Sequence, residues 1–489
     1  MPISLRTPSL LRTQAFLGGQ WSDAGSGATF AVRDPANGAE LGRVPRCGAG
    51  ETRRAIEAAA AAQPAWRAQT AQQRATVLRR FFAELCEHAD DLAMLITREQ
   101  GKPLAEARGE VLYAGAFLEW FAEEARRLYG ETIPAPRADT RILVFREPVG
   151  VGAGITPWNF PAAMIARKIA PALAAGCAMV VKPAEATPLT ALALAELAAR
   201  AGLPAGLLSV VTGSAEDAPE IGAELTANPL VRALSFTGST AVGKRLMAQC
   251  SGTVKRVSLE LGGNAPFLVF DDADLVAAVE GALASKFRNA GQTCVCANRI
   301  LVQDGIHERF VAAFAERIRA LVVAPGTEPG AQIGPLIDAD GFAKVERHVA
   351  DATRHGARIE VGGRPHARGG TFYEPTLLSG ITPDMELAQQ ETFGPVAGIL
   401  RFREEAEAVR IANDTPAGLA AYFYARDAAR IWRVGEALEY GMVGINTGMI
   451  STEVAPFGGV KESGIGREGA RQGIDEWVET KYLCWGGVS

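Results

Sequence analysis

Short β-branched segments alternate with alanine- and leucine-rich segments through the middle of the chain, and this alternation constrains the fold more than any other feature. The strand-like run ILVFREPVGVGAGI is followed by the helix-like run PAAMIARKIAPALAAG, and the strand-like CAMVVKP is followed by the helix-like TALALAELAARAG. Two more strand-like runs, LLSVVTG and ALSFTG, come after them. Strand and helix patterns at this spacing are typical of right-handed βαβ units, which place parallel strands in one sheet with helices on both faces. The sequence therefore predicts an α/β protein.

Two further blocks flank this region. Residues 51–130 have a helical pattern with one apolar face, and Pro64 and the turn at 101–103 are expected to divide it into separate helices. A second alternating block runs from about residue 262 to 460. A chain of 489 residues is too long for one ordinary core and indicates two or three domains. The final strand-like run, ETKYLCWGG, has nothing left in the sequence to pair with, so we expect it to pair with another subunit.

Charge and hydropathy exclude two classes of partner. The formal net charge is −5 and the pI is near 5.8, which argues against nucleic-acid binding, because contacts to phosphate need a basic surface. No uninterrupted apolar run reaches the roughly 18 residues of a membrane span. The first residues lack the apolar region of a secretory signal, although two arginines leave a mitochondrial address open. We expect a cytoplasmic protein without nucleic-acid or membrane partners.

The seven cysteines show no disulfide framework and no metal pattern. Five of them are scattered among small or apolar neighbours and are expected to be small buried side chains. The other two, Cys294 and Cys296, are one residue apart, but none of the five histidines supplies a CxxC or HxxxH partner. No metal site is predicted, and an odd cysteine count is typical of a reducing compartment.

The run FTGSTAVGK, residues 236–244, predicts a strand, a tight turn at Gly238 and Ser239, and a helix that begins at once. Free backbone N–H groups at such a helix start bind anions. The spacing resembles a P-loop, but residue 245 is Arg where a P-loop needs Ser or Thr to hold magnesium. The pyrophosphate of a dinucleotide fits better, since it needs backbone donors and no metal.

The run VVKPAE places Lys182 and Glu185 at the carboxyl end of a predicted parallel strand, where ligands bind in such sheets. Glu185 can accept hydrogen bonds from a ribose 2′-hydroxyl and would repel a 2′-phosphate. This interpretation favours NAD over NADP, with Lys182 close enough to soften the preference. The alternative is an ordinary solvated loop.

Two further motifs supply candidate catalytic groups. In LELGG, Glu260 is a single acid at an apolar strand end; if it is desolvated, its pKa rises and it becomes a base near neutral pH. In TPWNFP, two prolines rigidify a turn and hold the Asn159 amide in one orientation, as an oxyanion donor requires. The alternatives are a salt-bridged structural glutamate and an Asx turn.

Cys294 follows the turn-like Gly291-Gln292-Thr293, directly after a predicted helix. A thiol attacks only as the thiolate and therefore needs a base, yet no histidine lies within ten residues. A cysteine–histidine pair is possible over a longer distance, but no histidine lies in a comparable turn. Cys294, Glu260 and Asn159 instead describe a nucleophile, a base and an oxyanion donor beside a dinucleotide.

The chain resembles the aldehyde dehydrogenase superfamily over essentially its full length, and within it the succinate-semialdehyde dehydrogenases. The motifs TPWNFP, VVKPAE, FTGST, LELGG, FRNAGQTCVC, ETFGPV and PFGGVKESGIGREG stand in the order of that family. The resemblance implies a Rossmann-type NAD(P) domain of residues 1–129 and 150–261 and a catalytic α/β domain of residues 262–460. A small oligomerisation β-arm, residues 130–149 and 468–489, would build a homodimer or homotetramer.

The resemblance also implies roles for individual residues. Cys294 would be the nucleophile, Glu260 the base that activates the hydrolytic water, and Asn159 with the Cys294 N–H the oxyanion hole. The thiolate would add to the aldehyde, hydride would pass to the nicotinamide, and water would release the acid from a thioester. The positions that match the family's cofactor contacts are Thr156, Pro157, Trp158, Lys182, Glu185, Gly238, Ser239, Glu391 and Phe393.

Substrate selection is implied by three positions. Arg167, Arg288 and Ser451 match the residues that hold the far carboxylate of succinate semialdehyde in this subfamily. Two guanidinium groups that converge on a pocket would bind a carboxylate bidentately. The longer glutarate semialdehyde can use the same residues, and one methylene is worth only about 1–3 kcal/mol of discrimination.

Three alternatives stay open. The resemblance suggests a reversible Cys294–Cys296 disulfide as a redox switch, against a packing role for Cys296. A CoA-acylating aldehyde dehydrogenase would share the fold and nucleophile but would not need Glu260. A catalytically inactive structural protein of the same fold is disfavoured because every chemical position is filled.

Overall fold

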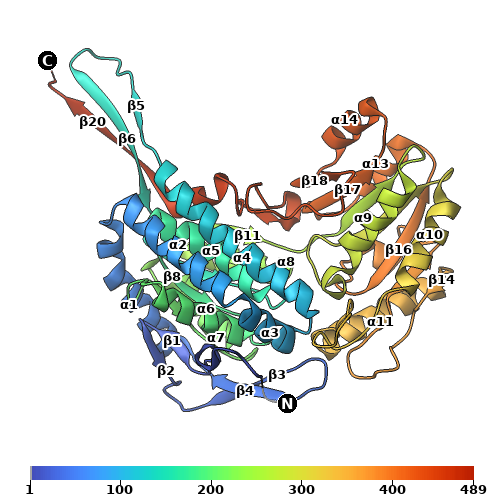
Figure 1. Ribbon diagram of the computed structural model, residues 1–489. Coiled ribbons are helices and arrows are strands. Elements are labelled where there is room, and N and C mark those ends of the chain that lie inside the picture. The colour runs from blue at the N-terminus through green and yellow to red at the C-terminus, as the bar shows by residue number, and fades with distance from the viewer. Residues whose placement is uncertain (1–2, 489) are drawn as a thin grey trace.

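The computed structural model describes residues 3–488 and contains two large sheets, each with its own helices (Figure 1). The first is an eight-stranded sheet in the order β19-β11-β10-β7-β8-β9-β1-β2. Its central five strands are parallel, as the alternation predicts, and the short edge strands β1, β2 and β19 run antiparallel. The strands are β1 (Ala15–Leu17), β2 (Gln20–Ser22), β7 (Val151–Ile155), β8 (Ala178–Lys182), β9 (Leu208–Val210), β10 (Val231–Thr237), β11 (Arg256–Glu260) and β19 (Gly464–Ile465).

Eight helices accompany the first sheet, and their apolar faces form one continuous core with it. α5 is buried at every position, which explains why its sequence is almost uniformly apolar. Within residues 3–488 no helix is long and apolar enough to cross a membrane. The helices are α1 (Ala49–Arg67), α2 (Ala71–Glu87), α3 (Ala89–Gln100), α4 (Leu104–Glu124), α5 (Pro161–Ala175), α6 (Pro188–Arg200), α7 (Ala218–Ala227) and α8 (Thr240–Cys250).

The second sheet has seven strands in the order β14-β15-β16-β13-β12-β17-β18, all parallel except the edge strand β14. Two separate apolar clusters pack against it. Its strands are β12 (Ala265–Val269), β13 (Ala297–Gln303), β14 (Arg358–Val361), β15 (Thr376–Ser379), β16 (Val396–Phe402), β17 (Ala420–Tyr424) and β18 (Met442–Ile445). Its helices are α9 (Leu275–Phe287), α10 (His307–Arg319), α11 (Ala339–Arg354), α12 (Glu386–Gln389), α13 (Glu405–Asn413) and α14 (Ala428–Ala437).

A slender arm projects from the first sheet and ends near the C-terminus (Figure 1). It is a three-stranded antiparallel sheet of β5 (Glu131–Ile133), β6 (Thr140–Pro148) and β20 (Val478–Gly486). β20 pairs with β6 along its whole length, so the final strand has a partner in its own chain. The expectation that nothing in this chain pairs with it is therefore wrong, although the arm exposes the large side chains Tyr482, Leu483 and Trp485. A separate hairpin joins β3 (Thr29–Arg33) and β4 (Glu40–Pro45).

The N-terminal helices confirm one predicted break and correct the other. Gly101 takes a left-handed conformation with φ 98° and ends α3, and Pro103 precedes α4. Pro64, by contrast, lies inside α1. It removes one hydrogen bond near the end of that helix, while buried Trp66 retains the last turn by donating from Nε1 to the Leu173 carbonyl at 2.9 Å.

Candidate active site

A cavity of about 400 Å³ lies between the carboxyl ends of β7, β10 and β11 and the loop that leads into β13. Strand ends of a parallel sheet are where ligands bind in such folds. The structure brings twelve residues predicted from the sequence to this cavity and leaves Thr156, Lys182, Glu185 and Cys296 outside its lining. The twelve are Pro157, Trp158, Asn159, Arg167, Gly238, Ser239, Glu260, Arg288, Cys294, Glu391, Phe393 and Ser451.

Cys294 sits between the end of α9 and the start of β13. Three successive residues before it, Asn289, Ala290 and Gly291, have positive φ values of 51°, 54° and 75°, and a Cβ at Gly291 would lie 2.1 Å from the Gly394 carbonyl oxygen. This tight turn needs a glycine there and aims Cys294 into the cavity. Burial, with the nearby Glu391, raises the pKa of the thiol to about 12. The resting nucleophile is therefore a neutral thiol that needs a proton acceptor.

Glu260 ends β11 and faces the same cavity. Both of its carboxyl oxygens are buried, and neither has a hydrogen-bond partner in the part of the chain that the structure describes. Burial, followed by the negative charge of Glu468, raises the pKa of Glu260 well above its usual range. A carboxyl group with a raised pKa and free oxygens can take a proton from a thiol or from water.

Asn159 lies in the turn between β7 and α5. Its Nδ2 donates to the Gln292 carbonyl oxygen at 3.1 Å, which fixes the orientation of the amide and leaves the second N–H free. The N–H of Cys294 likewise has no acceptor among residues 3–488. The two free donors belong to the cavity wall that holds the nucleophile, as an oxyanion hole requires.

A buried ion pair between Lys102 and Glu110 supports the turn that carries Asn159. Lys102 Nζ donates to the Asn159 carbonyl oxygen at 2.7 Å and to Glu110 Oε2 at 2.5 Å, and both side chains are completely buried. Glu110 Oε1 accepts from the N–H groups of Ala162 and Ala163, in the first turn of α5. The pair thus ties α4 and the turn at 101–103 to the backbone that carries Asn159.

The predicted phosphate turn has the expected form. Ser239 is the N-cap of α8, and its Oγ accepts from the Val242 N–H at 3.4 Å, while the Gly238 N–H donates to the Glu260 carbonyl at 3.0 Å. The remaining N–H groups of the first turn are left for an anion at the cavity edge. This donor set fits the pyrophosphate of a dinucleotide.

Lys182 and Glu185 lie at the end of β8, beside Thr156, whose N–H donates to the Lys182 carbonyl at 3.1 Å. Lys182 Nζ lies 3.7 Å from Glu185 Oε2, with Lys182 buried and Glu185 44% exposed. Burial lowers the pKa of Lys182, and Glu185 opposes that shift. An exposed carboxylate beside a buried ammonium group can meet the hydroxyls of a ribose.

Glu391 and Phe393 form another part of the cavity wall together with Trp158. Glu391 Oε1 accepts from the Gly263 N–H at 3.3 Å, and burial raises the pKa of Glu391 to about 7. The rings of Phe393 and Trp158 meet edge to face at 5.5 Å. Lys344, which belongs to none of the sequence motifs, lines the same wall from α11.

The two predicted arginines differ in their surroundings. The Arg167 guanidinium stacks 3.9 Å from the Phe457 ring centre, and its Nε lies 2.8 Å from Glu468 Oε2, so that part of its charge is balanced inside the protein. Its Nη2 is buried without a hydrogen-bond partner among the described residues. Arg288 lies over the Phe160 ring at 5.3 Å and makes no ion pair or hydrogen bond with its side chain in residues 3–488.

Glu468 joins this end of the cavity to the first sheet. Its Oε1 accepts from Lys168 Nζ at 2.5 Å, and Lys168 also donates to Ser235 and Thr237. No local pattern predicts that Glu468 and Lys168 pair, because they are 300 residues apart in the chain. Tyr113 on α4, also missed, lines the cavity nearby.

Cys296 is buried behind the nucleophile. Its Sγ lies 3.5 Å from the Lys286 carbonyl oxygen, and its N–H donates to the Thr293 carbonyl at 3.0 Å. All seven cysteines are free thiols, and no group of three potential metal ligands occurs within residues 3–488. The expectation that the five scattered cysteines are buried is wrong for Cys484, which is exposed, and for Cys86, which is half-buried.

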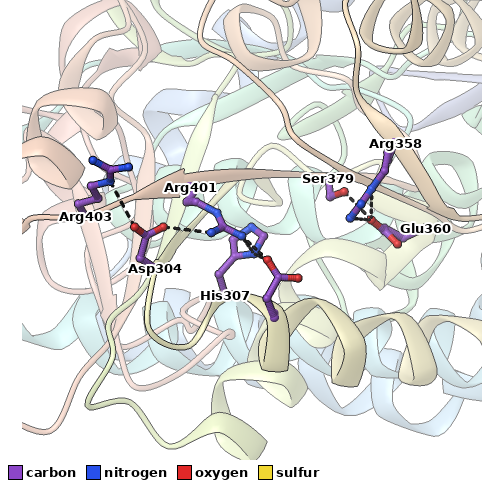
Figure 2. Close-up of polar contacts among 8 residues, drawn as sticks. Asp304, His307, Arg358, Glu360, Ser379, Arg401 and Arg403 are labelled. Atoms are coloured by element: carbon purple, nitrogen blue, oxygen red, sulfur yellow. Dashed lines mark hydrogen bonds and ion pairs between the residues drawn. The ribbon is translucent and has the colours of Figure 1, made fainter.

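A second hollow, of about 660 Å³, lies at the carboxyl ends of β15 and β16, the edge of the second sheet opposite to the one that carries Cys294. Figure 2 shows charged residues around it: Arg401 contacts Asp304 and His307, and Arg358 pairs with Glu360. Arg401 also pairs with Glu308. Glu360 also accepts from Ser379 Oγ at 2.5 Å. The charges drawn there already balance one another, as in a structural ion-pair network.

Comparison with known proteins agrees with this geometry. Residues 21–483 match the model of the aldehyde dehydrogenase family. A succinate-semialdehyde dehydrogenase of Escherichia coli named for NADP(+) is 60% identical over 99% of this chain and 100% of that protein. A glutarate-semialdehyde dehydrogenase of Pseudomonas aeruginosa is also 60% identical, over 99% of this chain and 100% of that protein. The crystal structure of a Burkholderia pseudomallei succinate-semialdehyde dehydrogenase has a TM-score of 0.97 at 61% identity, and the match covers 99% of this chain and 100% of that one.

The chain belongs to the aldehyde dehydrogenase family. The predicted α/β fold class is confirmed, and so is the resemblance stated from the motifs.

Proposed function

We propose that this protein oxidises a short aldehyde with a distal carboxylate, succinate semialdehyde, to the corresponding acid with a nicotinamide dinucleotide. One observation carries the proposal: the end of the cavity beyond Cys294 gathers hydrogen-bond donors without acceptors of their own. These donors are the Arg288 guanidinium, Arg167 Nη2 and Ser451 Oγ. Buried or half-buried cations without partners are costly unless a ligand supplies the anion.

The first half of the reaction uses Cys294 and Asn159. The thiol transfers its proton to Glu260 and the sulfur adds to the aldehyde carbon, which places negative charge on the aldehyde oxygen. The free N–H groups of Asn159 and Cys294 donate to that oxygen. Glu391 and Phe393 would hold the nicotinamide, which would supply a hydride acceptor. Loss of the hydride from the adduct leaves a thioester on Cys294.

The second half uses Glu260 again. Once its proton has left to solvent, the Glu260 carboxylate takes a proton from a water molecule, which attacks the thioester carbon. The acid leaves and the Cys294 thiol is restored. A CoA-acylating enzyme would not need this base, so the free, buried Glu260 favours hydrolysis.

We infer that NAD is preferred over NADP. Glu185 is exposed at the end of β8, and its negative charge would repel a 2′-phosphate, while the neighbouring Lys182 opposes this effect. The E. coli relative is named for NADP(+), so the preference is argued from Glu185 alone. Ser239 and the first turn of α8 would hold the pyrophosphate.

We further propose that residues 1–129 and 150–261 form the NAD(P) domain, residues 262–460 the catalytic domain, and residues 130–149 and 468–489 an oligomerisation arm. The separate cores of the two large sheets support this division. The exposed apolar side chains of the arm support a homodimer or homotetramer. Unpaired cysteines favour a reducing compartment, the cytoplasm.

The test is formation of reduced nicotinamide from succinate semialdehyde, glutarate semialdehyde and butanal, each with NAD and with NADP. We expect the highest kcat/KM for succinate semialdehyde with NAD. Arg288→Ala should lower kcat/KM for both semialdehydes by about 10- to 100-fold, because it removes charged hydrogen bonds to the carboxylate, and should leave butanal unchanged. Arg309→Ala, an exposed arginine on α10, is the matched control.

An equal kcat/KM for butanal and succinate semialdehyde in wild type, with no effect of Arg288→Ala, would refute the carboxylate assignment. A higher kcat/KM for glutarate semialdehyde would keep the carboxylate site and assign the longer substrate.

A further inference from the structure

Tyr113 has an unused donor at the end of the cavity that holds the two arginines. It extends from α4 into the cavity lining, and its ring meets Phe117 at 5.0 Å between centres. Its hydroxyl oxygen is buried and has no hydrogen-bond partner in the described part of the chain. A buried hydroxyl without a partner is unusual, because its loss of water is not compensated.

The surroundings of the hydroxyl define what can satisfy it. Arg167 and Arg288 are both near enough to lower the pKa of Tyr113, while burial, the largest effect, and the carboxylates of Glu468 and Glu453 raise it. The net shift is upward, so the phenol keeps its proton and is a donor. Two guanidiniums and one phenol then face the same space, and all three can donate to an oxyanion.

The site offers two guanidiniums to a carboxylate, and one of them is already partly engaged inside the protein. A carboxylate offers about four lone-pair sites on its two oxygens. The Arg167 Nε already pairs with Glu468. The donors that remain for the carboxylate are therefore Arg167 Nη2, Arg288 and Ser451. The Tyr113 hydroxyl is a further donor, since it is neutral and has no hydrogen-bond partner among the described residues.

We propose that Tyr113 is a specificity-determining residue whose hydroxyl donates a hydrogen bond to the distal carboxylate of the substrate. The proposal rests on the proposed function, since it names a further contact of the same site. In this role Tyr113 contacts the carboxylate end of the substrate and not the reacting carbon. The O–H of the phenol rotates about its C–O bond, so its hydrogen can point toward an anion in the cavity.

The test compares Tyr113→Phe, which removes one oxygen atom, with Tyr129→Phe, a control at a tyrosine that is 72% exposed. Tyr113→Phe should raise KM for succinate semialdehyde about tenfold, as expected for a hydrogen bond to a charged group, with kcat within about twofold. Butanal, which has no tail charge, should show no change. Tyr129→Phe should match wild type for both substrates.

A second measurement separates a ligand contact from a structural role. The unfolding temperature is recorded without ligand and with succinate, the product of the proposed reaction. Tyr113→Phe should unfold at or above the wild-type temperature without ligand, because it removes an unpaired buried hydroxyl, and the increase produced by succinate should shrink. A hydroxyl that serves only the fold would instead lower the ligand-free unfolding temperature.

The outcomes distinguish this inference from the proposed function. If Arg288→Ala weakens succinate semialdehyde selectively and Tyr113→Phe does not, the role of Tyr113 is refuted and the carboxylate site stands. If neither variant affects succinate semialdehyde, both proposals fail. A selective loss in both variants supports both.

Discussion

Glu260 determines the pH dependence that we expect of the reaction. Burial and the charge of Glu468 hold its pKa above the usual range of a carboxyl group, and its function as a base requires the ionised form. Turnover should therefore be low below the raised pKa and should increase as pH rises through it. The measurement is kcat against pH for wild type and for Glu260→Asp, which keeps the carboxyl group. A flat profile through the neutral and alkaline range would contradict the assignment.

At the scale of single residues, sequence patterns predict candidate reactive side chains better than they predict which charged groups lie next to them. Motifs at strand ends and turns predict Cys294, Glu260 and Asn159 as catalytic groups, and the structure brings all three to the lining of one cavity. The sequence does not show that Glu468 balances Arg167, nor that Lys102 lies under Asn159. Those contacts join segments far apart in the chain, and nothing in either segment alone reports a distant charge.

Among the elements, the turn at 101–103 and the start of α5 form one unit through Lys102 and Glu110. Lys102→Met would leave Glu110 buried without its cation, which should lower the free energy of unfolding by about 3–5 kcal/mol. It should also lower kcat more than it raises KM, because the Asn159 turn loses a support at its carbonyl oxygen. Denaturant unfolding and steady-state kinetics on the folded fraction measure the two effects.

Lys244→Met is the matched control for this prediction. Lys244 also pairs with a glutamate, Glu462, but the two side chains are 58% and 49% exposed, so little change in stability is expected. If Lys102→Met unfolds more easily yet keeps the wild-type kcat per folded molecule, Lys102 supports the fold and does not position Asn159.

The elements were predictable where periodicity is strong. The alternating segments became the parallel strands β7 to β11 and their helices, since each strand end is followed by a turn and an apolar helix. Proline usually ends a helix, which favours a break at Pro64, but the burial of Trp66, two residues further on, outweighs that preference. No pattern predicts the short hairpins β1–β2 and β3–β4, because strands of three to six residues are too short to show a clear alternation of polar and apolar residues.

For the whole molecule, the projecting arm predicts an assembly. Tyr482, Leu483 and Trp485 on β20 are 67%, 47% and 63% exposed on a three-stranded sheet that projects from the body (Figure 1). A sheet this small does not bury its own apolar side chains, so a second copy is expected to cover them. Leu483→Asp combined with Trp485→Asp should reduce the molar mass measured by light scattering toward that of one chain.

Val322→Glu is the control for the arm. Val322 is 47% exposed, as is Leu483, but it lies in the loop after α10 and not on the arm. A double variant with the molar mass of wild type would exclude the arm as the interface. The sequence indicates a terminal strand that is available for pairing. It does not indicate which surfaces meet in an assembly, because that depends on how far the arm projects, and no local sequence pattern shows this.

The central claim is that Cys294 carries the acyl group and that Glu260 is needed for its hydrolysis. It is tested most directly by mixing Glu260→Gln with succinate semialdehyde and NAD and measuring the intact mass of the protein and of its Cys294 peptide. The amide keeps the size of the side chain but cannot accept a proton from water. At alkaline pH, where hydroxide can deprotonate the Cys294 thiol in place of Glu260, we predict slow turnover and a succinyl adduct on the Cys294 peptide, formed only when NAD is present. An unmodified Cys294 together with wild-type turnover would contradict the account.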